Sequence, residues 1–181
     1  MRVVAGEYRG RQLKSPTWDG LRPTSDRLRE TLFNSRAPRV RGARVLDGYA
    51  GTGALGIEAM SRGAASAAFV DLDRRAQALV EANLAHCGLT NGCVIIRASV
   101  ARAIEDFRNA SSSFDLILLD PPYDEAAADV VGAAGELLAQ DGVLVLEHAR
   151  RQPAAVSAGR LERTRQVISG DSVLSFYSCL P

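Results

Sequence analysis

The fold is decided by Val45-Leu46-Asp47-Gly48-Tyr49-Ala50-Gly51-Thr52-Gly53, a short apolar run that leads into a glycine-rich loop. With Gly56 the loop completes the pattern G-x-G-x-x-G, and an acid follows about 20 residues after the first glycine. Glycine lets the backbone approach a ligand closely, and the following helix offers free N–H groups at its N-terminus. The pattern predicts a nucleotide-binding strand, loop and helix, with the ligand at the carboxyl ends of the strands of a parallel sheet.

Outward from this loop, apolar strands alternate with helices. Strands are predicted at residues 43–47, 66–71, 93–98, 114–120 and 142–147, and helices at residues 53–62, 74–86, 100–107 and 125–139. Strands that are apolar on both faces, each followed by a helix, are typical of an α/β, Rossmann-like, doubly wound and mostly parallel sheet. The tail differs, because residues 161–168 and 172–179 predict an antiparallel hairpin that closes one edge of the sheet.

The N-terminal part is small and basic. Residues 2–13 predict a short hairpin, and residues 25–33 predict a helix. Residues 1–44 hold eleven Lys and Arg against four acids, a net charge of +7, whereas the rest holds eleven against seventeen. We therefore expect residues 1–40 to be an extension that contacts a polyanion and residues 41–181 to be the catalytic domain, although a solvated basic face remains the alternative.

Composition excludes several protein classes. The chain has 181 residues, of which 46% are hydrophobic and 24% charged, as in an ordinary globular protein with one core. It has no apolar run of about 18 residues and no signal-peptide core, so we expect a cytoplasmic protein without a membrane partner. Its three cysteines form no C-x-x-C pair and only two histidines are present, so no metal site is expected.

The glycine loop alone fits two cofactors, a nicotinamide dinucleotide and S-adenosylmethionine. Asp47 favours the second, because an acid beside the loop would repel a pyrophosphate but suits the zwitterionic methionine end of the methyl donor. Asp71 ends an apolar strand and is expected to bind the ribose, whereas Asp73 is expected to cap the next helix. The full set of predicted donor contacts is Asp47, Tyr49, Ala50, Gly51, Thr52, Gly53, Asp71, Leu72, Ala98 and Ser99. For Ser99, a helix N-cap is an equal alternative to a contact with adenine.

A second motif, Asp120-Pro121-Pro122-Tyr123, follows the fourth predicted strand and predicts the catalytic site. An exocyclic amine is a poor nucleophile because its lone pair is delocalised into the ring. The Asp120 carboxylate and the Pro121 carbonyl can accept its two N–H bonds, which directs the lone pair toward the sulfonium methyl. Proline fixes this backbone, and Tyr123 offers a stacking surface worth about 1 to 3 kcal/mol. A rigid turn with a core tyrosine is the structural alternative.

Hydrogen-bonding chemistry limits which base can be the target. Guanine presents N1–H and N2–H side by side, two donors that one carboxylate can accept, whereas adenine presents one donor and one acceptor. Asp120 therefore favours guanine mildly. Methylation at carbon 5 of cytosine needs a cysteine nucleophile, and Cys87, Cys93 and Cys179 do not occupy a suitable position.

Taken together, these motifs give the chain a specific resemblance that spans nearly its whole length. It resembles the bacterial family that methylates guanine N2 in small-subunit (16S) ribosomal RNA. The segments that carry this resemblance are Val3-Val4-Ala5-Gly6-Glu7-Tyr8-Arg9-Gly10-Arg11, Arg22-Pro23-Thr24-Ser25-Asp26-Arg27-Leu28-Arg29-Glu30-Thr31-Leu32-Phe33-Asn34, Ala50-Gly51-Thr52-Gly53-Ala54-Leu55-Gly56-Ile57-Glu58-Ala59, Ser61-Arg62-Gly63-Ala64 and Asp120-Pro121-Pro122-Tyr123.

The resemblance implies a class I methyltransferase that uses S-adenosylmethionine, releases S-adenosylhomocysteine and acts on ribosomal RNA or a small-subunit particle as a monomer. The basic extension over residues 1–40, here called the leader, would bind RNA through Arg9, Arg11 and Lys14. Arg22, Thr24 and Arg29 would line the path to the donor. The chain departs from the family at Gly48-Tyr49, where an apolar-Phe pair is usual, and at Ser99, where an acid is usual, which predicts weaker donor binding.

Three other functions remain open at this stage. A DNA adenine-N6 methyltransferase shares D-P-P-Y, but such enzymes usually carry a target-recognition insertion that this chain has no room for. A protein glutamine methyltransferase would use the same acceptors, and the basic leader argues against it. A catalytically silent RNA-binding assembly factor is disfavoured because both motifs are intact.

Overall fold

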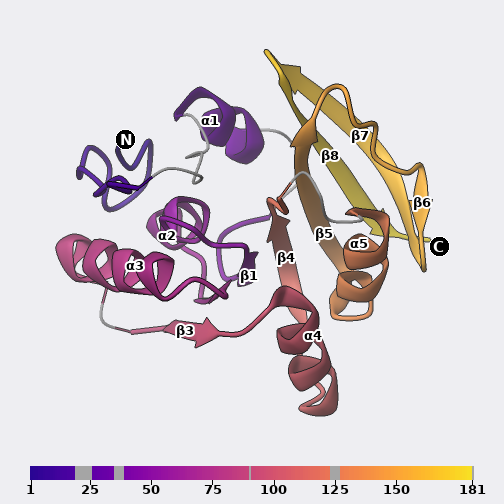
Figure 1. Ribbon diagram of the computed structural model, residues 1–181, viewed down its shortest axis with the longest axis horizontal. Coiled ribbons are helices and arrows are strands. Elements are labelled where there is room, and N and C mark those ends of the chain that lie inside the picture. Colours follow the sequence, from indigo (N-terminus) through magenta and orange to yellow (C-terminus); the bar gives the residue numbers. More distant parts are fainter. Residues whose placement is uncertain (19–25, 35–38, 90, 123–126, 181) are drawn as a thin grey trace.

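The computed structural model describes residues 1–18, 26–34, 39–89, 91–122 and 127–180. Within them the strands form an eight-stranded sheet in the order β3-β2-β1-β4-β5-β8-β7-β6 (Figure 1). The strands are β1 (Arg44–Gly48), β2 (Ser66–Asp71), β3 (Cys93–Arg97), β4 (Phe114–Leu119), β5 (Leu138–Ala149), β6 (Ser157–Ala158), β7 (Leu161–Ser169) and β8 (Ser172–Cys179). The first five are parallel, and β8 pairs antiparallel with β5.

Helices cover both faces of the parallel part of the sheet. They are α1 (Asp26–Asn34), α2 (Ala54–Ser61), α3 (Arg74–Cys87), α4 (Val100–Asn109) and α5 (Ala127–Gly135). Alternate residues of a strand enter different cores: Val45 packs in the cluster that includes residues of α1, α2 and α3, whereas Leu46 packs in the cluster with α4 and α5. The predicted doubly wound sheet with a closing antiparallel hairpin is therefore confirmed.

The N-terminal segment packs closely against α2 and α3. It forms a small antiparallel turn with a bridge between Arg2 and Gln12. The buried Glu58 carboxylate of α2 accepts from the backbone N–H groups of Val4 (2.8 Å) and Ala5 (3.0 Å). The Asn83 side chain of α3 accepts from the Lys14 N–H at 2.7 Å. Because these partners are backbone groups, the leader is held in one register on the helices.

The strongest difference from the sequence prediction lies between α5 and β5. The helix predicted over residues 125–139 ends at Gly135, and β5 already begins at Leu138. The cause is tertiary, because Leu138 pairs with Phe114 of β4 and the Gly135 backbone packs so closely on Leu161 that an added Cβ would lie 2.8 Å from its Cγ. The first residues of that predicted helix, 125 and 126, lie outside the described residues. Strand β6 was not predicted.

Among the residues that the structure describes, none of the helices combines the length and the apolar character needed to cross a bilayer.

Candidate active site

The two predicted motifs meet at the carboxyl edge of the sheet, where β1 lies between β2 and β4. In the β1–β4 pairing, Gly48 is opposite Leu119, so the glycine loop that follows β1 lies next to Asp120. In the β1–β2 pairing, Gly48 is opposite Val70, which precedes Asp71. Ligands of open α/β sheets bind in the crevice outside these strand ends. The loop and both predicted acids are thus close neighbours.

The glycine loop turns sharply through left-handed backbone. Tyr49, Gly51 and Gly53 have φ values of 62°, 55° and 75°. At Gly53 an added Cβ would lie 3.2 Å from both methyl groups of Val80, so glycine is needed there for conformation and for space. Gly53 is also the N-cap of α2 and has no side-chain cap, which leaves the helix N-terminus directed at the loop.

Two polar side chains form hydrogen bonds that hold the glycine loop in place. The Asn83 amide donates to the Thr52 carbonyl at 2.9 Å, and the Thr52 hydroxyl accepts weakly from the Ala54 N–H at 3.3 Å. Ala50 and Thr52 are buried. The contact of residues 49–53 with a donor stays a prediction, and these hydrogen bonds hold the loop backbone against α2 and α3.

Asp71 is oriented toward the loop by its neighbours. One carboxylate oxygen accepts from the Gly51 N–H and the other from the Asp73 N–H, both at 2.9 Å. Each oxygen still has a lone pair for a ribose hydroxyl. The Asp73 side chain caps α3 by accepting from the Arg75 N–H at 2.8 Å, which confirms the predicted cap. Leu72 between them is 66% exposed, an unusual apolar surface beside a polar site.

Ser99 lies at the N-cap of α4, where its hydroxyl accepts from the Arg102 N–H at 3.2 Å. The helix-cap alternative is therefore confirmed for Ser99. Ala98 precedes it, half-buried, just after β3. Because Asp71 is opposite Arg97 in the β2–β3 pairing, Ala98 and Ser99 follow β3 on the side of Leu72. Their contact with adenine stays a prediction.

Asp47 lies beneath the loop with only 1% of its surface exposed. Its carboxylate accepts from the Gly56 N–H at 2.8 Å and so ties β1 to the first turn of α2. Burial, reinforced by the negative charge of Asp71, raises the pKa of Asp47 to about 8. The structure thus shows Asp47 as a support between β1 and α2. The expected contact of Asp47 with the methionine end of the donor stays a prediction.

Asp120 follows the last residue of β4 and is surrounded by other acids. Burial raises its pKa well above the usual range, and the nearby Glu147 and Asp47 carboxylates raise it further. Pro121 is buried and Pro122 is exposed. Tyr123, the last residue of the predicted catalytic motif, lies outside the described residues. Perturbed carboxyl groups at a strand edge of this kind mark a functional-site candidate.

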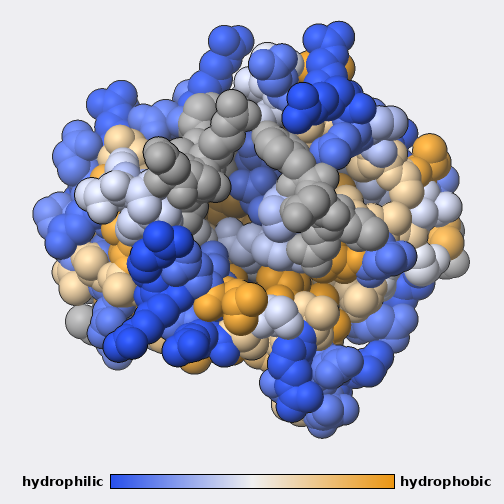
Figure 2. Space-filling view, viewed as in Figure 1, coloured by the Kyte–Doolittle hydropathy of each residue, from blue (hydrophilic) through white to orange (hydrophobic). Residues whose placement is uncertain are grey.

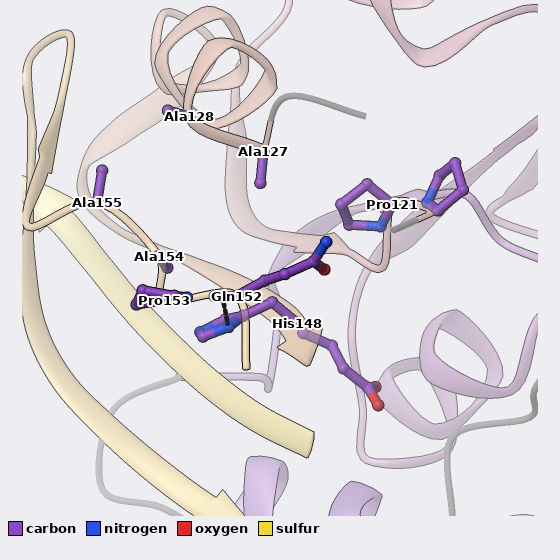
Figure 3. Close-up of a pocket in the computed structure, with 10 residues that line it drawn as sticks. Pro121, Ala127, Ala128, His148, Gln152, Pro153, Ala154 and Ala155 are labelled. Atoms are coloured by element: carbon purple, nitrogen blue, oxygen red, sulfur yellow. Dashed lines mark hydrogen bonds between the residues drawn. The ribbon is translucent and has the colours of Figure 1, made fainter. Parts of the chain in front are cut away.

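Sequence reasoning missed Glu147. In the β4–β5 pairing Leu119 is opposite Leu146, which brings the following residues Asp120 and Glu147 side by side. Glu147 also lines a pocket of about 380 Å³ that begins at Pro121 and Pro122 (Figure 3). The available signal was an acid at the carboxyl end of the predicted strand 142–147, next to the strand that ends in D-P-P-Y.

The predicted RNA contacts fall into two groups. Arg9, Arg11 and Lys14, here called the leader cations, are exposed, and Figure 2 shows hydrophilic surface on the side of the N-terminal segment. Arg11 donates to the Cys87 carbonyl, and its guanidinium lies 5.0 Å from the centre of the Tyr8 ring. Arg22 and Thr24 lie outside the described residues.

Arg29, which the resemblance places on the path to the donor, lies in the interior of the protein. Its side chain is fully buried and donates to the Arg2 carbonyl at 2.7 Å and to Asp26 at 2.5 Å. These bonds attach the start of the leader to α1. A direct contact between Arg29 and RNA stays a prediction.

Within the part of the chain that the structure describes, no group of three His, Cys, Asp or Glu side chains has the arrangement of a metal site. Asp47 and Asp71 belong to different strands, and each carboxyl group is held by backbone N–H groups. The arrangement therefore offers hydrogen-bond acceptors, a glycine loop and negative potential, which suit a cationic, nucleoside-containing ligand.

Comparison with known proteins identifies related sequences and folds. The model of the family described as Conserved hypothetical protein 95 matches residues 1–178. The chain is 36% identical over 180 residues to "Putative rRNA methyltransferase YlbH" of Bacillus subtilis, with 98% of each chain covered. It is 40% identical over 123 residues to "Ribosomal RNA small subunit methyltransferase D" of Escherichia coli, covering 68% of this chain and 60% of that protein. The solved structure "Putative methyltransferase yhhF from Escherichia coli" superposes with a TM-score of 0.84 at 25% identity, over 100% of this chain and 98% of the other. The fold is that of class I methyltransferases.

Proposed function

Because the chain belongs to the family of bacterial small-subunit ribosomal RNA methyltransferases described as Conserved hypothetical protein 95, we propose that it transfers a methyl group from S-adenosylmethionine to N2 of a guanine in that RNA. The observation that carries this proposal is the strand pairing that brings Asp120 of the D-P-P segment beside the glycine loop. Donor site and acceptor site are then adjacent, as direct transfer requires.

The donor supplies an electrophilic methyl group on a sulfonium. The chain's own residues supply orientation. Asp71, with both oxygens fixed by backbone N–H groups, accepts from the ribose hydroxyls, and the exposed Leu72 with Ala98 and Ser99 borders the adenine. The loop over residues 49–53 bounds the methionine end.

Asp120 and the Pro121 carbonyl act on the acceptor. Each takes one N–H of the exocyclic amine, which holds the nitrogen lone pair in line with the methyl group. Such positioning can supply about 7 to 11 kcal/mol of the barrier reduction without a covalent intermediate. The aromatic ring of Tyr123 would stack on the base.

The carboxylates favour the donor over the product. Asp120 and Glu147 follow paired residues of β4 and β5, and burial, reinforced by this acidic neighbour, raises the pKa of Asp120. A sulfonium cation relieves this repulsion, whereas the thioether of the product carries no charge. Loss of the charge on transfer thus favours product release.

We assign RNA binding to residues 1–40, where the leader cations are exposed, and methyl transfer to residues 41–181. A target guanine must be unpaired or flipped from its stack, at a cost of a few kcal/mol. A small-subunit particle is the favoured substrate, because a short basic leader has little means of reading sequence. The protein would act as a monomer.

The test is to incubate the protein with labelled donor and DNA, naked ribosomal RNA or small-subunit particles that lack the modification, and then to identify the labelled nucleoside. N2-methylguanosine in ribosomal RNA is expected. Asp120→Ala should abolish transfer but leave affinity for S-adenosylhomocysteine nearly unchanged, with Asp141→Ala, at an exposed acid, as the control. N6-methyladenosine in DNA would establish the rival activity, and unaltered turnover by Asp120→Ala would remove that residue from the mechanism.

A further inference from the structure

The pocket next to the D-P-P segment has an unusually uniform lining. Of the ten lining residues that the structure describes, seven are proline or alanine, and the other three are Glu147, His148 and Gln152. Proline rings and alanine methyl groups form smooth apolar walls without flexible side chains, and proline contributes no N–H group. Such walls suit a flat heteroaromatic ring, and a pocket of about 380 Å³ can accept one.

His148 does not provide the pocket's recognition group. One ring nitrogen lies 2.9 Å from the Gln152 carbonyl oxygen (Figure 3). The other lies 2.8 Å from the Ser175 hydroxyl. Both nitrogens are therefore engaged, one with the turn after β5 and the other with β8. Glu147 and Gln152 are the other polar residues among the described residues of the lining, and Figure 3 shows the Gln152 side chain reaching along the pocket toward Pro121.

Glu147 lies beside the acceptor Asp120. The residues that precede them, Leu119 and Leu146, are paired in the parallel ladder, and the two carboxyl groups interact electrostatically. A ligand that donates one hydrogen to Asp120 thus has its neighbouring ring atom close to Glu147. The pocket and the acid pair form one continuous site.

We propose that this pocket holds the target base and that Glu147 selects guanine by accepting its N1–H while Asp120 accepts from its N2 amine. The inference rests on the proposed function and adds a specificity residue to it. Guanine places the two donors side by side, as the two acids require. Adenine turned to offer its amine to Asp120 would place the N1 lone pair against the Glu147 carboxylate, and a site built in this way rejects the wrong base through repulsion.

The Gln152 amide completes the pattern, because its N–H can donate to guanine O6 at the far end of the same edge. The exposed Arg150 and Arg151 immediately precede Gln152 in the chain, and we expect them to contact phosphates that flank the flipped nucleotide.

The experiment compares the wild type, Glu147→Gln and the control Glu81→Gln, the same change at an exposed position of α3. The substrates are small-subunit particles with the target guanine, once located, intact or replaced by adenine. For guanine, Glu147→Gln should lower kcat/KM by about 10- to 100-fold, as expected for loss of a charged hydrogen-bond acceptor, with unchanged affinity for S-adenosylhomocysteine. For adenine, the wild type should give no product, and the glutamine variant, whose amide can donate to N1, should give measurable N6-methyladenosine.

The outcomes separate the two proposals. If the wild type makes no N2-methylguanosine in any ribosomal substrate, the proposed function itself is wrong. If it does, and Glu147→Gln methylates guanine at the wild-type rate, the assignment of Glu147 is overturned. Should the variant fail to fold, the wild type alone decides, because equal methylation of adenine-substituted particles would overturn the inference.

Discussion

Replacing Asp47 with asparagine should remove most of the pH dependence that this carboxyl gives to stability. Burial, with a contribution from Asp71, raises the pKa of Asp47 from 3.8 to about 8. Between these values the folded chain keeps a proton that the unfolded chain has released. Stability contributed by this group is therefore greatest below the unfolded pKa and is lost as pH rises, by about 1.4 kcal/mol per pH unit across the window.

Asparagine preserves the shape and an oxygen that accepts from the Gly56 N–H, but it does not titrate. Relative to the wild type, Asp47→Asn should therefore gain about 3 kcal/mol between about pH 5 and about pH 7. Urea unfolding followed by circular dichroism measures this, with the exposed Asp141→Asn as control. Wild-type and Asp47→Asn stabilities that change in parallel with pH would refute a protonated, buried Asp47.

Three further changes test other parts of the account. Neutralising the leader cations should weaken binding to ribosomal RNA and reduce the slope of log affinity against log salt by about 2 to 3, and filter binding that gives an unchanged slope would exclude phosphate contacts there. Glu58→Ala should lower the free energy of unfolding by about 3 kcal/mol, because two partly buried backbone N–H groups of the leader lose a buried acceptor; an unchanged urea midpoint would contradict this. Gly56→Ala should destabilise by about 1 to 3 kcal/mol through overpacking, since its Cβ would lie 2.3 Å from a phenylalanine ring carbon of β2. Gly132→Ala, where the nearest atom is 3.6 Å away, is its control, and equal melting temperatures would disprove the close packing.

Much of the fold could be predicted because its signals are local. The bounds of β2 and the start of α3 agree with the prediction, since an unbroken apolar run and the Asp73 cap define them within a few residues. Parallel topology then brings the strand ends together, so the proximity of Asp71 and Asp120 to the glycine loop followed from strand order alone.

The rest depends on partners distant in sequence. Glu58 lies within a helix and carries no local sign that the backbone of Val4 and Ala5 will use its carboxylate. Arg29 was predicted on the substrate path, but the Arg2 carbonyl and Asp26 hold it in the interior. Glu147 became a candidate only when pairing of β4 with β5 brought it to Asp120.

The most direct test of the central claim is a crystal structure of the protein with S-adenosylhomocysteine. We expect the adenine beside Leu72, the ribose hydroxyls on Asp71, and the sulfur facing Asp120 across the carboxyl ends of β1 and β4. A ligand bound away from the glycine loop, or with its sulfur directed away from Asp120, would contradict the claim that donor and acceptor share this edge.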